Sequence, residues 1–148
     1  MPLSVSTRGR YGLRLMVELA MGYGRGITLL KDVSRKEGLS EKYLGQIIIP
    51  LRSAGLVLSQ RGSHGGYALA RPPEEITVKD VVEAIEGRIC PAPCAEDPAE
   101  CSHAGACASS RVWRRLAEDM ERSLASFTLA DLAREAKHAR VPAGNYSI

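Results

Sequence analysis

Two short helical patterns separated by one tight turn are the feature that most limits how this chain can fold. The first, ITLLKDVSRKEG, begins after Thr28 and stops at Gly38, and the second, SEKYLGQIIIPLRSAG, begins with Ser40 as its N-cap. Two helices joined in this way are typical of a helix-turn-helix, although a plain helical hairpin gives the same pattern. Because Pro50 removes a backbone donor, the regular part of the second helix is predicted to be residues 40–49.

A glycine-rich hairpin follows the second helix directly. Residues 56–59 (LVLS) and 67–70 (YALA) have the composition of two short strands, and the turn QRGSHGG between them carries Arg61 near its tip. A helix-turn-helix followed by such a hairpin indicates a winged helix, which is a much more specific pattern than a helix-turn-helix alone.

The remaining short helices are predicted from their caps. Ser6 or Thr7 starts a helix over RGRYGLRLMVELAMGYG. Thr77 opens the helix TVKDVVEAIEG, and Thr128 caps a last short helix, TLADLAREAKHA. Residues 88–108 carry three prolines and all four cysteines, so they are predicted to form a loop.

A long helix is predicted from about Ser109 to Ser126. Its apolar residues make one broad face: Val112, Trp113, Leu116, Met120, Leu124 and Phe127. Such a face packs either in a core or against a second subunit, and a chain this small has little core left to cover so long a helix. The predicted fold is therefore mainly α, with a winged helix-turn-helix, a small β-hairpin wing and a long C-terminal dimerisation helix.

Charge is unevenly divided along the 148 residues, a length that suits one domain or two small ones. Residues 1–72 hold 11 Lys and Arg against 4 Asp and Glu, whereas residues 73–148 hold 9 against 13. The positive first half favours nucleic acid as a partner, although a solvated surface gives the same imbalance. Because the sequence has neither an apolar run of roughly 20 residues nor the features of a secretory signal, the cytoplasm is expected, with no membrane partner.

The four cysteines stand in one segment with the spacing C-x3-C-x6-C-x5-C: Cys90, Cys94, Cys101 and Cys107. Clustered cysteines in the cytosol more often bind metal or sense redox state than form structural disulfides. Structural zinc sites usually contain a C-x2-C pair, which this segment lacks, so an iron–sulfur cluster is the stronger interpretation. The sequence shows no Cys/His/Asp arrangement with an obvious base and no phosphate-binding glycine motif, so an enzyme is not expected.

Over roughly residues 3–137 the chain resembles the IscR/NsrR family of bacterial transcription regulators. The similar pieces are STRGRYGLRLM, LSEKYLGQIIIPLRSAGLV, QRGSHGGYALA, ITVKDVVEAIEG and CAEDPAECSHAGACASSRVWRRL. The wing and the cysteine block together are highly specific. The resemblance implies a homodimeric winged-helix repressor or activator, in which the long helix pairs the subunits and loop cysteines hold a [2Fe–2S] or [4Fe–4S] cluster.

Alignment with this family on Trp113 implies a set of three cluster ligands: Cys94, Cys101 and Cys107. The fourth ligand stays open. Where some relatives carry a histidine, this chain has Ser110, and residues 7–10 offer no carboxylate of the kind that other members use. The candidates for a fourth ligand are Cys90, His103 and Ser110, although an exposed loop residue is the more ordinary role for His103.

In a winged helix, the second helix of the motif enters the major groove with its N-terminal residues toward the base edges. The candidates on that helix are Ser40, Lys42, Tyr43 and Gln46. Gln46 suits adenine, Lys42 suits guanine or phosphate, and Tyr43 suits either a phosphate or core packing. Arg61 suits a narrow A·T-rich minor groove. Candidate phosphate contacts, unless they are ordinary surface charges, are Arg8, Arg10 and Arg52.

The sequence thus predicts a homodimeric transcription regulator that binds a pseudo-palindromic DNA operator and senses iron–sulfur cluster status, redox state or nitric oxide. A cluster-free winged-helix regulator of thiol oxidation or a metabolite is the alternative, and a zinc-stabilised adaptor is a third interpretation. The predicted segments are a winged-helix DNA-binding domain over 1–72, a linking helix and cluster loop over 73–108, the dimerisation helix and a short helix over 109–140, and a mobile tail over 141–148.

Overall fold

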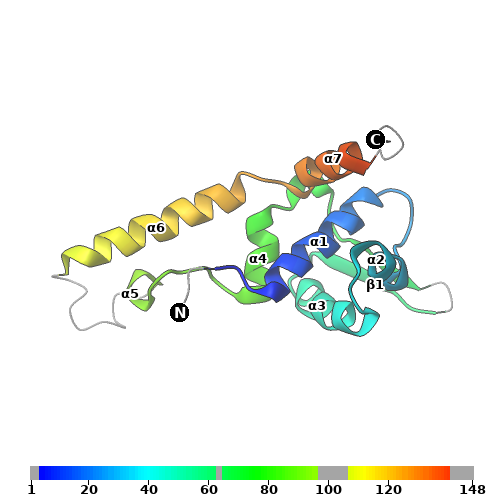
Figure 1. Ribbon diagram of the computed structural model, residues 1–148, viewed down its shortest axis with the longest axis horizontal. Coiled ribbons are helices and arrows are strands. Elements are labelled where there is room, and N and C mark those ends of the chain that lie inside the picture. Colours follow the sequence, from blue (N-terminus) through cyan, green and yellow to red (C-terminus); the bar gives the residue numbers. More distant parts are fainter. Residues whose placement is uncertain (1–3, 63–64, 97–106, 141–148) are drawn as a thin grey trace, which may run out of the picture.

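Helix α1 (Thr7–Met21) runs through the middle of the molecule. The computed structural model describes residues 4–62, 65–96 and 107–140. Within them, α1 contacts helices α2 (Leu30–Glu37), α3 (Glu41–Ser53), α4 (Val78–Glu86) and α7 (Leu129–Arg140) and strand β2 (Gly66–Leu69). Figure 1 shows these elements gathered into one body, from which helix α6 (Ala108–Ala125) projects.

The sequence of α1 explains its central position. Leu15, Met16 and Leu19 are fully buried, as their helical spacing predicts. Ser6 caps the helix, because its Oγ accepts a hydrogen bond from the Gly9 N–H at 3.0 Å. A Cβ on Gly12 would overlap Ile85 Cδ1, so glycine at this position lets α1 and α4 approach closely.

The helix-turn-helix predicted from the sequence is confirmed in α2 and α3. Gly38 ends α2 with a φ of 69°, a left-handed conformation that favours glycine. Ser40 then caps α3, since its Oγ accepts from the Tyr43 N–H at 3.1 Å. The helix continues past Pro50 for a further turn, beyond the predicted regular part, because proline lacks only its own N–H and the fully buried Leu51 holds this turn against the core.

The wing is an antiparallel hairpin in which strand β1 (Val57–Gln60) pairs with β2. Both strands are shifted by one residue toward the turn from their predicted ranges. The cause is Leu56, whose N–H donates to the Leu51 carbonyl at 3.0 Å and so closes the end of α3. Leu56 still accepts a hydrogen bond from the Ala70 N–H at 3.0 Å, which fixes the base of the wing.

The segment before α2 adds a third edge to the wing. Thr28 pairs with Tyr67 in an isolated bridge, through backbone hydrogen bonds of 2.7 and 2.8 Å. A Cβ on Gly66 would lie 2.7 Å from the Thr28 carbonyl oxygen, so this close approach requires glycine. The wing is therefore tied to the start of the helix-turn-helix as well as to its end.

Two capping boxes lie where α4 and α7 begin. Thr77 and Asp80 exchange hydrogen bonds of 2.9 and 3.1 Å, and Thr128 and Asp131 exchange bonds of 3.0 and 3.1 Å. Thr77 and Thr128 also form an isolated antiparallel bridge, closed by two backbone hydrogen bonds of 2.9 Å each. The short helix η1 (Pro73–Glu75) leads into this bridge and contacts α7. Both predicted threonine caps are confirmed.

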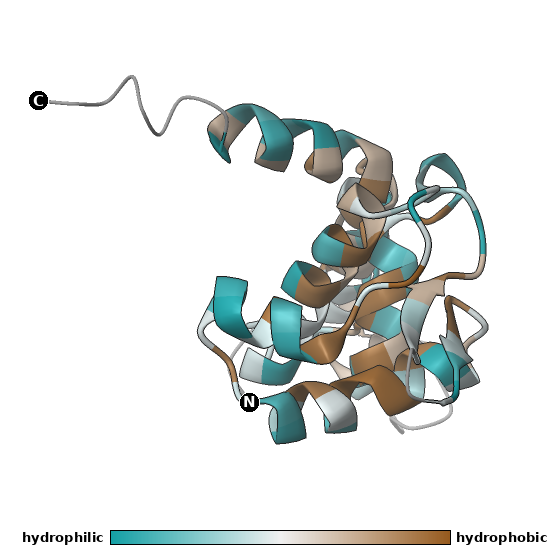
Figure 2. Cartoon of the chain, turned by 90° about the vertical axis from the view of Figure 1, so that its right-hand side faces the viewer, coloured by the Kyte–Doolittle hydropathy of each residue, from teal (hydrophilic) through white to brown (hydrophobic). Residues whose placement is uncertain are grey.

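The core lies between these helices and the base of the wing, and Figure 2 shows hydrophobic segments turned toward the centre of the body. Its largest fully buried side chains are Leu15, Met16, Leu19, Val33, Leu44, Ile47, Ile48, Leu51, Ile76, Val81 and Leu129. The mainly helical winged-helix fold is therefore confirmed. Among the described residues, no helix has the length and apolarity that crossing a membrane requires.

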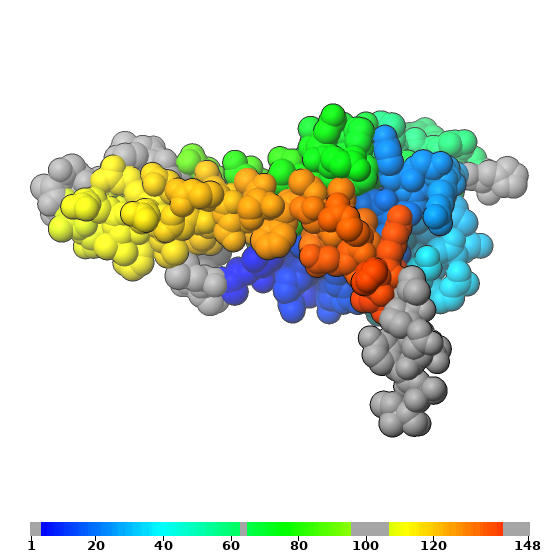
Figure 3. All heavy atoms as spheres, turned by 90° about the horizontal axis from the view of Figure 1, so that it is seen from above, coloured from blue at the N-terminus to red at the C-terminus, as the bar shows by residue number. Residues whose placement is uncertain are grey.

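The predicted cysteine loop is not wholly irregular, because helix α5 (Pro93–Glu96) forms one turn within it. Proline at the first position of this turn needs no N–H partner there, which favours a helical start. Figure 3 shows α6 continuing beyond the body, and we call this helix, residues 108–125, the arm. The tail after residue 140 lies outside the described residues.

Candidate nucleic-acid interface and cysteine segment

The outer face of α3 is open to solvent along its length. Lys42 and Gln46 are exposed one turn apart, and Ile49 continues the same face with 58% of its surface exposed. The inner face is formed by residues with almost no exposure: Leu44, Ile47, Ile48 and Leu51. The core thus fixes the direction in which the predicted base-reading side chains point.

Tyr43 lies between these two faces. It is half-buried, and its ring meets the Tyr11 ring edge-on, with centroids 6.0 Å apart and planes at 84°. The guanidinium groups of Arg10 and Arg14 lie 5.9 and 5.4 Å from the centroid of the Tyr11 ring. This packing supports the interpretation of Tyr43 as a packing residue that joins α3 to α1.

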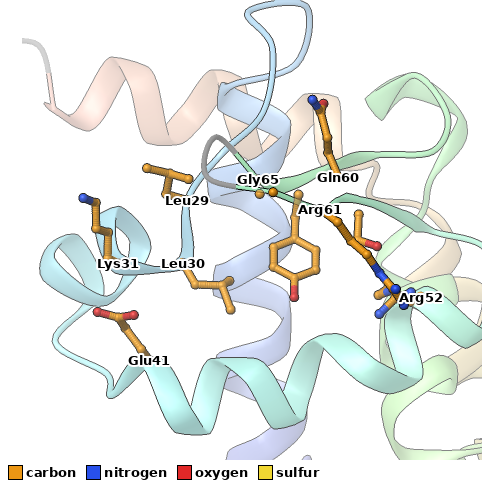
Figure 4. A pocket seen from close by; sticks show the side chains of 12 residues that line it. Leu29, Leu30, Lys31, Glu41, Arg52, Gln60, Arg61 and Gly65 are labelled. Carbon is orange, nitrogen blue, oxygen red and sulfur yellow. The ribbon is translucent and has the colours of Figure 1, made fainter.

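A cavity of about 580 Å³ separates α2 and α3 from the wing. Figure 4 shows Arg52, from α3, and Arg61, from the end of β1, pointing toward one another across one end of it. Lys31 and Glu41 lie at the opposite end. Of the predicted DNA contacts, Arg52 on the helix and Arg61 on the wing therefore border the same cavity.

Several predicted DNA contacts carry charges that nothing described in the structure neutralises. Within the described part of the chain, no ion pair is formed by Arg8, Arg10, Lys42, Arg52 or Arg61, and all five are exposed. Arg10 donates to Thr7 Oγ1 at 3.3 Å. Exposed cations without carboxylate partners are available to phosphates.

Sequence reasoning missed two residues of this surface. Ile49 follows Gln46 by three positions, so the helical period alone could have placed it on the outer face. Lys31 borders the cavity beside the wing, but nothing in the sequence indicates that α2 and the wing face one another.

Two of the predicted cluster ligands lie on packed elements. Cys94 lies on α5, and Cys107 is the N-cap of α6, against which α5 packs. Cys101 and His103 lie outside the described residues. The Cys90 thiol donates to the Ala92 carbonyl at 2.9 Å, within its own turn. Cys94 and Cys107 therefore belong to two helices that contact one another.

Cys107 has the chemistry of a metal ligand. Hydrogen bonding to the Ser109 side chain, and to the backbone of Ser110 and Ser109, lowers the pKa of its thiol. Ser110, the position where some relatives carry histidine, is buried and donates through its Oγ to the Cys107 carbonyl at 2.8 Å. The described residues contain no group of three potential metal ligands, since Cys101 is not among them. A thiol of lowered pKa at the N-terminus of α6, with a second thiol on the helix α5 that contacts α6, fits the donor set that an iron–sulfur cluster needs.

The arm presents an apolar face that the described chain leaves largely uncovered. Val112 is 57% exposed and Trp113 is also exposed, as is Phe127, which follows the arm. Leu116, Met120 and Leu124 are half-buried. The arm also contacts α4, and just after α4 Arg88 Nε lies 3.5 Å from Glu121 Oε1.

Known proteins match this chain over most of its length. A family model described as "Rrf2: Iron-dependent Transcriptional regulator" matches residues 5–135. The HTH-type transcriptional regulator CymR of Bacillus subtilis is 43% identical over 131 residues, which cover 88% of this chain and 90% of CymR. Protein rrf2 of Nitratidesulfovibrio vulgaris is 40% identical over 134 residues, covering 90% and 89%.

Solved structures give the same result. The structure of CymR, described as the global cysteine regulator of B. subtilis, matches with a TM-score of 0.74 and 42% identity, covering 89% of this chain and 97% of that one. The structure of IscR from T. potens matches with a TM-score of 0.74 and 38% identity, covering 93% and 91%. The resemblance drawn from the sequence is confirmed, and the chain belongs to the Rrf2 family of DNA-binding transcription regulators.

Proposed function

We propose that this chain is a homodimeric regulator in the cytoplasm, whose affinity for a pseudo-palindromic DNA operator changes when loop cysteines gain or lose an iron–sulfur cluster. The observation that carries the proposal is the packing of α5, which carries Cys94, against α6, whose N-cap is Cys107. These two thiols flank the segment that holds Cys101, and Cys107 stands at the end of the arm that lies away from the body (Figure 1).

DNA contact is supported by the outer face of α3 and the adjoining wing. Lys42 and Gln46 are exposed on that face and reach toward base edges when α3 enters the major groove. The exposed arginines around them contribute contacts to phosphates, which position the protein without reading sequence.

Dimerisation is supported by the uncovered apolar face of the arm. A second copy packed along Val112, Leu116 and Met120 would bury side chains that one chain alone leaves in contact with water. Two copies related by a two-fold axis present two recognition helices, which calls for an operator with half-sites about one helical turn apart.

Cys94, Cys101 and Cys107 would hold the cluster, with the fourth position open to Cys90, His103, Ser110 or an external ligand. The cluster supplies iron sites that respond to oxidants, to nitric oxide and to cluster supply. The pKa of the Cys107 thiol is lowered, so a larger fraction of this thiol is ionised to thiolate at neutral pH. Ser110 holds the Cys107 carbonyl and so fixes the first turn of α6.

Contacts of this chain connect the cysteine segment to α3. The arm leads into α7 through the bridge between Thr77 and Thr128. At its other end α7 donates through Arg140 Nη2 to Glu37 Oε1 at 3.2 Å, next to the turn that precedes α3. A coupling of about 1–3 kcal/mol along such a connection changes DNA affinity roughly 5–150-fold.

Anaerobic purification with an absorption spectrum and with iron and sulfide assays tests the sensor. We expect a coloured protein with matched iron and sulfide, which Cys94→Ser, Cys101→Ser and Cys107→Ser lose. Retention of the colour in Cys90→Ser would exclude Cys90 as the fourth ligand, and its loss would assign that position to Cys90. A protein that stays colourless after anaerobic reconstitution would overturn the cluster and leave thiol oxidation as the signal.

Selection from a random duplex library, followed by affinity measurements on the selected duplex, tests the regulator. We expect a palindromic motif and different affinities for cluster-loaded and cluster-free protein at equal dimer content. Equal affinities would remove the coupling. Val112→Asp combined with Leu116→Asp should give monomers in sedimentation, whereas Glu118→Ala, on the opposite face of the arm, should not.

A further inference from the structure

The end of α4 is anchored on the start of α1. Glu86, the last residue of α4, accepts a hydrogen bond through its Oε1 from the Ser6 N–H at 2.6 Å. Because Ser6 is the N-cap of α1, the carboxylate lies at a helix N-terminus, where a negative charge is favourable. A Cβ on Gly9 would stand 2.7 Å from Glu86 Oε1, so glycine at this position makes room for the carboxylate. The body therefore holds α4 up to its last residue.

The two residues that follow α4 connect the chain to a different part of the molecule. Gly87 has a φ of 78°, a value that favours glycine, and open space where a side chain would stand. Arg88 Nε then lies 3.5 Å from Glu121 Oε1 on the arm. Glu86 and Arg88, on either side of one glycine, are thus attached to the body and to the arm respectively.

The chain passes from the arm back to the body at the other end of α4. The arm ends at Ala125, and the carbonyl of Phe127 accepts a hydrogen bond from the Val78 N–H at 2.9 Å. Val78 is the first residue of α4, whereas Gly87 follows its last residue. The two crossing points therefore lie at opposite ends of α4, and a line through them runs along that helix.

The core does little to fix the orientation of the arm about this line. No apolar side chain of residues 108–125 is buried, and the one buried residue of the arm, Ser110, stands near its far end. Figure 1 shows the arm projecting from the body. Of the ion pairs among the described residues, the one between Arg88 and Glu121 joins the arm to a residue outside it. A segment held in this way can turn as a unit while a few residues at its ends absorb the change in backbone angles.

We infer that the arm turns about α4, with Gly87 and residues 126–127 as its two hinges, and that the Arg88–Glu121 ion pair holds it in one orientation. The inference rests on the proposed function and describes how its regulation works. All four cysteines lie between the two hinges in the sequence, so the gain or loss of a cluster acts on the part that turns. In a dimer joined through the arms, such a turn changes the separation of the two α3 helices while each body keeps its structure.

The first experiment measures the distance between the arm and the body in the absence of DNA. A ketone-bearing amino acid replaces Arg25, in the loop between α1 and α2, and Glu118 on the arm. Both positions are exposed, and spin labels joined to the ketones leave the cysteines unaltered. Doubly labelled protein is exchanged into an excess of unlabelled protein, so that pulsed electron paramagnetic resonance reports distances within one chain.

Arg88→Gln and Glu121→Gln should each broaden or shift the distribution of this distance. Arg88→Glu combined with Glu121→Arg exchanges the two charges and should restore it. Arg115→Gln, which removes an ion pair with Asp119 inside the arm, is the control and should leave the distribution unchanged. An unaltered distribution in the two single variants would overturn the inference. So would a change that the exchanged pair does not restore, since it would come from the loss of a charge and not of the pair.

The second experiment compares operator affinity between cluster-loaded and cluster-free protein. Glu121→Gln should reduce the ratio of the two affinities by about twofold to fivefold, which is the range that a partly exposed ion pair supplies. The exchanged pair should recover the ratio, and the iron and sulfide content should stay the same in all variants. A ratio that Glu121→Gln leaves unchanged would overturn the inference. A protein whose arm responds to Glu121→Gln, but whose DNA affinity is the same with and without a cluster, would retain the hinge and lose the proposed function.

Discussion

Arg140 Nη2 lies 2.5 Å from Glu18 Oε1, which joins the last turn of α7 to the last turn of α1 across 122 positions of sequence. Glu18 is only 4% exposed, so the guanidinium neutralises a carboxylate that α1 buries. The same nitrogen lies 3.2 Å from Glu37 Oε1 at the end of α2. One side chain thus connects the C-terminal helix to both of the helices that precede the recognition helix α3.

Replacing Arg140 by alanine should destabilise the protein by about 1–3 kcal/mol. Breaking a fully buried pair costs roughly 3–5 kcal/mol, but the Arg140 side chain is 48% exposed and Lys36 Nζ remains 3.9 Å from Glu18 Oε2. Urea unfolding gives the change directly. Arg134→Ala, which removes a surface pair with Asp131 on the same helix, should stay within about 0.5 kcal/mol. Equal losses of stability in Arg140→Ala and Arg134→Ala would mean that the buried Glu18 carboxylate does not need Arg140 as its partner.

Stability should fall in acid because of Glu37. Burial of this side chain opposes ionisation, but hydrogen bonding to Glu18 and Arg14 and the charges of Arg14 and Arg140 outweigh it, so the pKa of Glu37 lies below its ordinary value of 4.5. A lowered native pKa means that the carboxylate stabilises the fold above about pH 4.5, and this contribution is lost as the pH falls through the native pKa.

The measurement is the urea midpoint between neutral pH and pH 3 for the unaltered protein and for Glu37→Gln. The variant should be less stable at neutral pH, and the difference should shrink as the pH falls. A difference that stays constant with pH would assign the effect to packing. Glu135→Gln, at an exposed position of α7, is the matched control.

Thr77→Ala and Thr128→Ala should each cost about 1 kcal/mol, because each hydroxyl accepts from the N–H three residues later and closes a capping box. The two threonines are also bridge partners, so the double variant should depart from additivity. Serine at either position keeps the hydroxyl and should restore most of the loss. Additive effects would indicate that the helix starts are independent despite the bridge.

Gly66→Ala should destabilise the wing by about 1–3 kcal/mol, since the added Cβ would lie 2.7 Å from the Thr28 carbonyl oxygen. Hydrogen exchange at the Thr28 and Tyr67 amides should quicken, because those two N–H groups form the bridge.

Gly45→Ala should have the opposite effect on stability. It stands within α3 with nothing within 4 Å of its Cβ, so it should stabilise the helix by about 0.5–1 kcal/mol.

The starts and stops of helices could be predicted because their hydrogen bonds are local. Ser6, Ser40, Thr77 and Thr128 each bond a backbone group three residues away, so a short stretch of sequence holds all the information. The one-residue shift of the wing could not be predicted in this way. It depends on Leu56 closing α3 instead of opening a strand.

The candidate site was predictable where it follows helical periodicity and not where it depends on packing between distant segments. Lys42 and Gln46 lie on the outer face because Leu44, Ile47 and Ile48 turn the opposite face of α3 into the core. The convergence of Arg52 and Arg61, and the pairing of Arg140 with Glu18, depend on how separate elements meet. Such contacts leave no pattern in a single sequence.

The bridge between Thr77 and Thr128 has a consequence for how this protein can diverge. The chain leaves the body after α4 and rejoins it at Thr128, which pairs with Thr77 at the start of α4. The bridge therefore fixes both ends of the excursion, the part of the chain between α4 and Thr128, on the body. Insertions, deletions or exchanged cysteines within that excursion need not move α1, α3 or the wing. A regulator with this fold can therefore change the signal that it senses while it keeps the DNA-binding surface, and with it the genes that it controls.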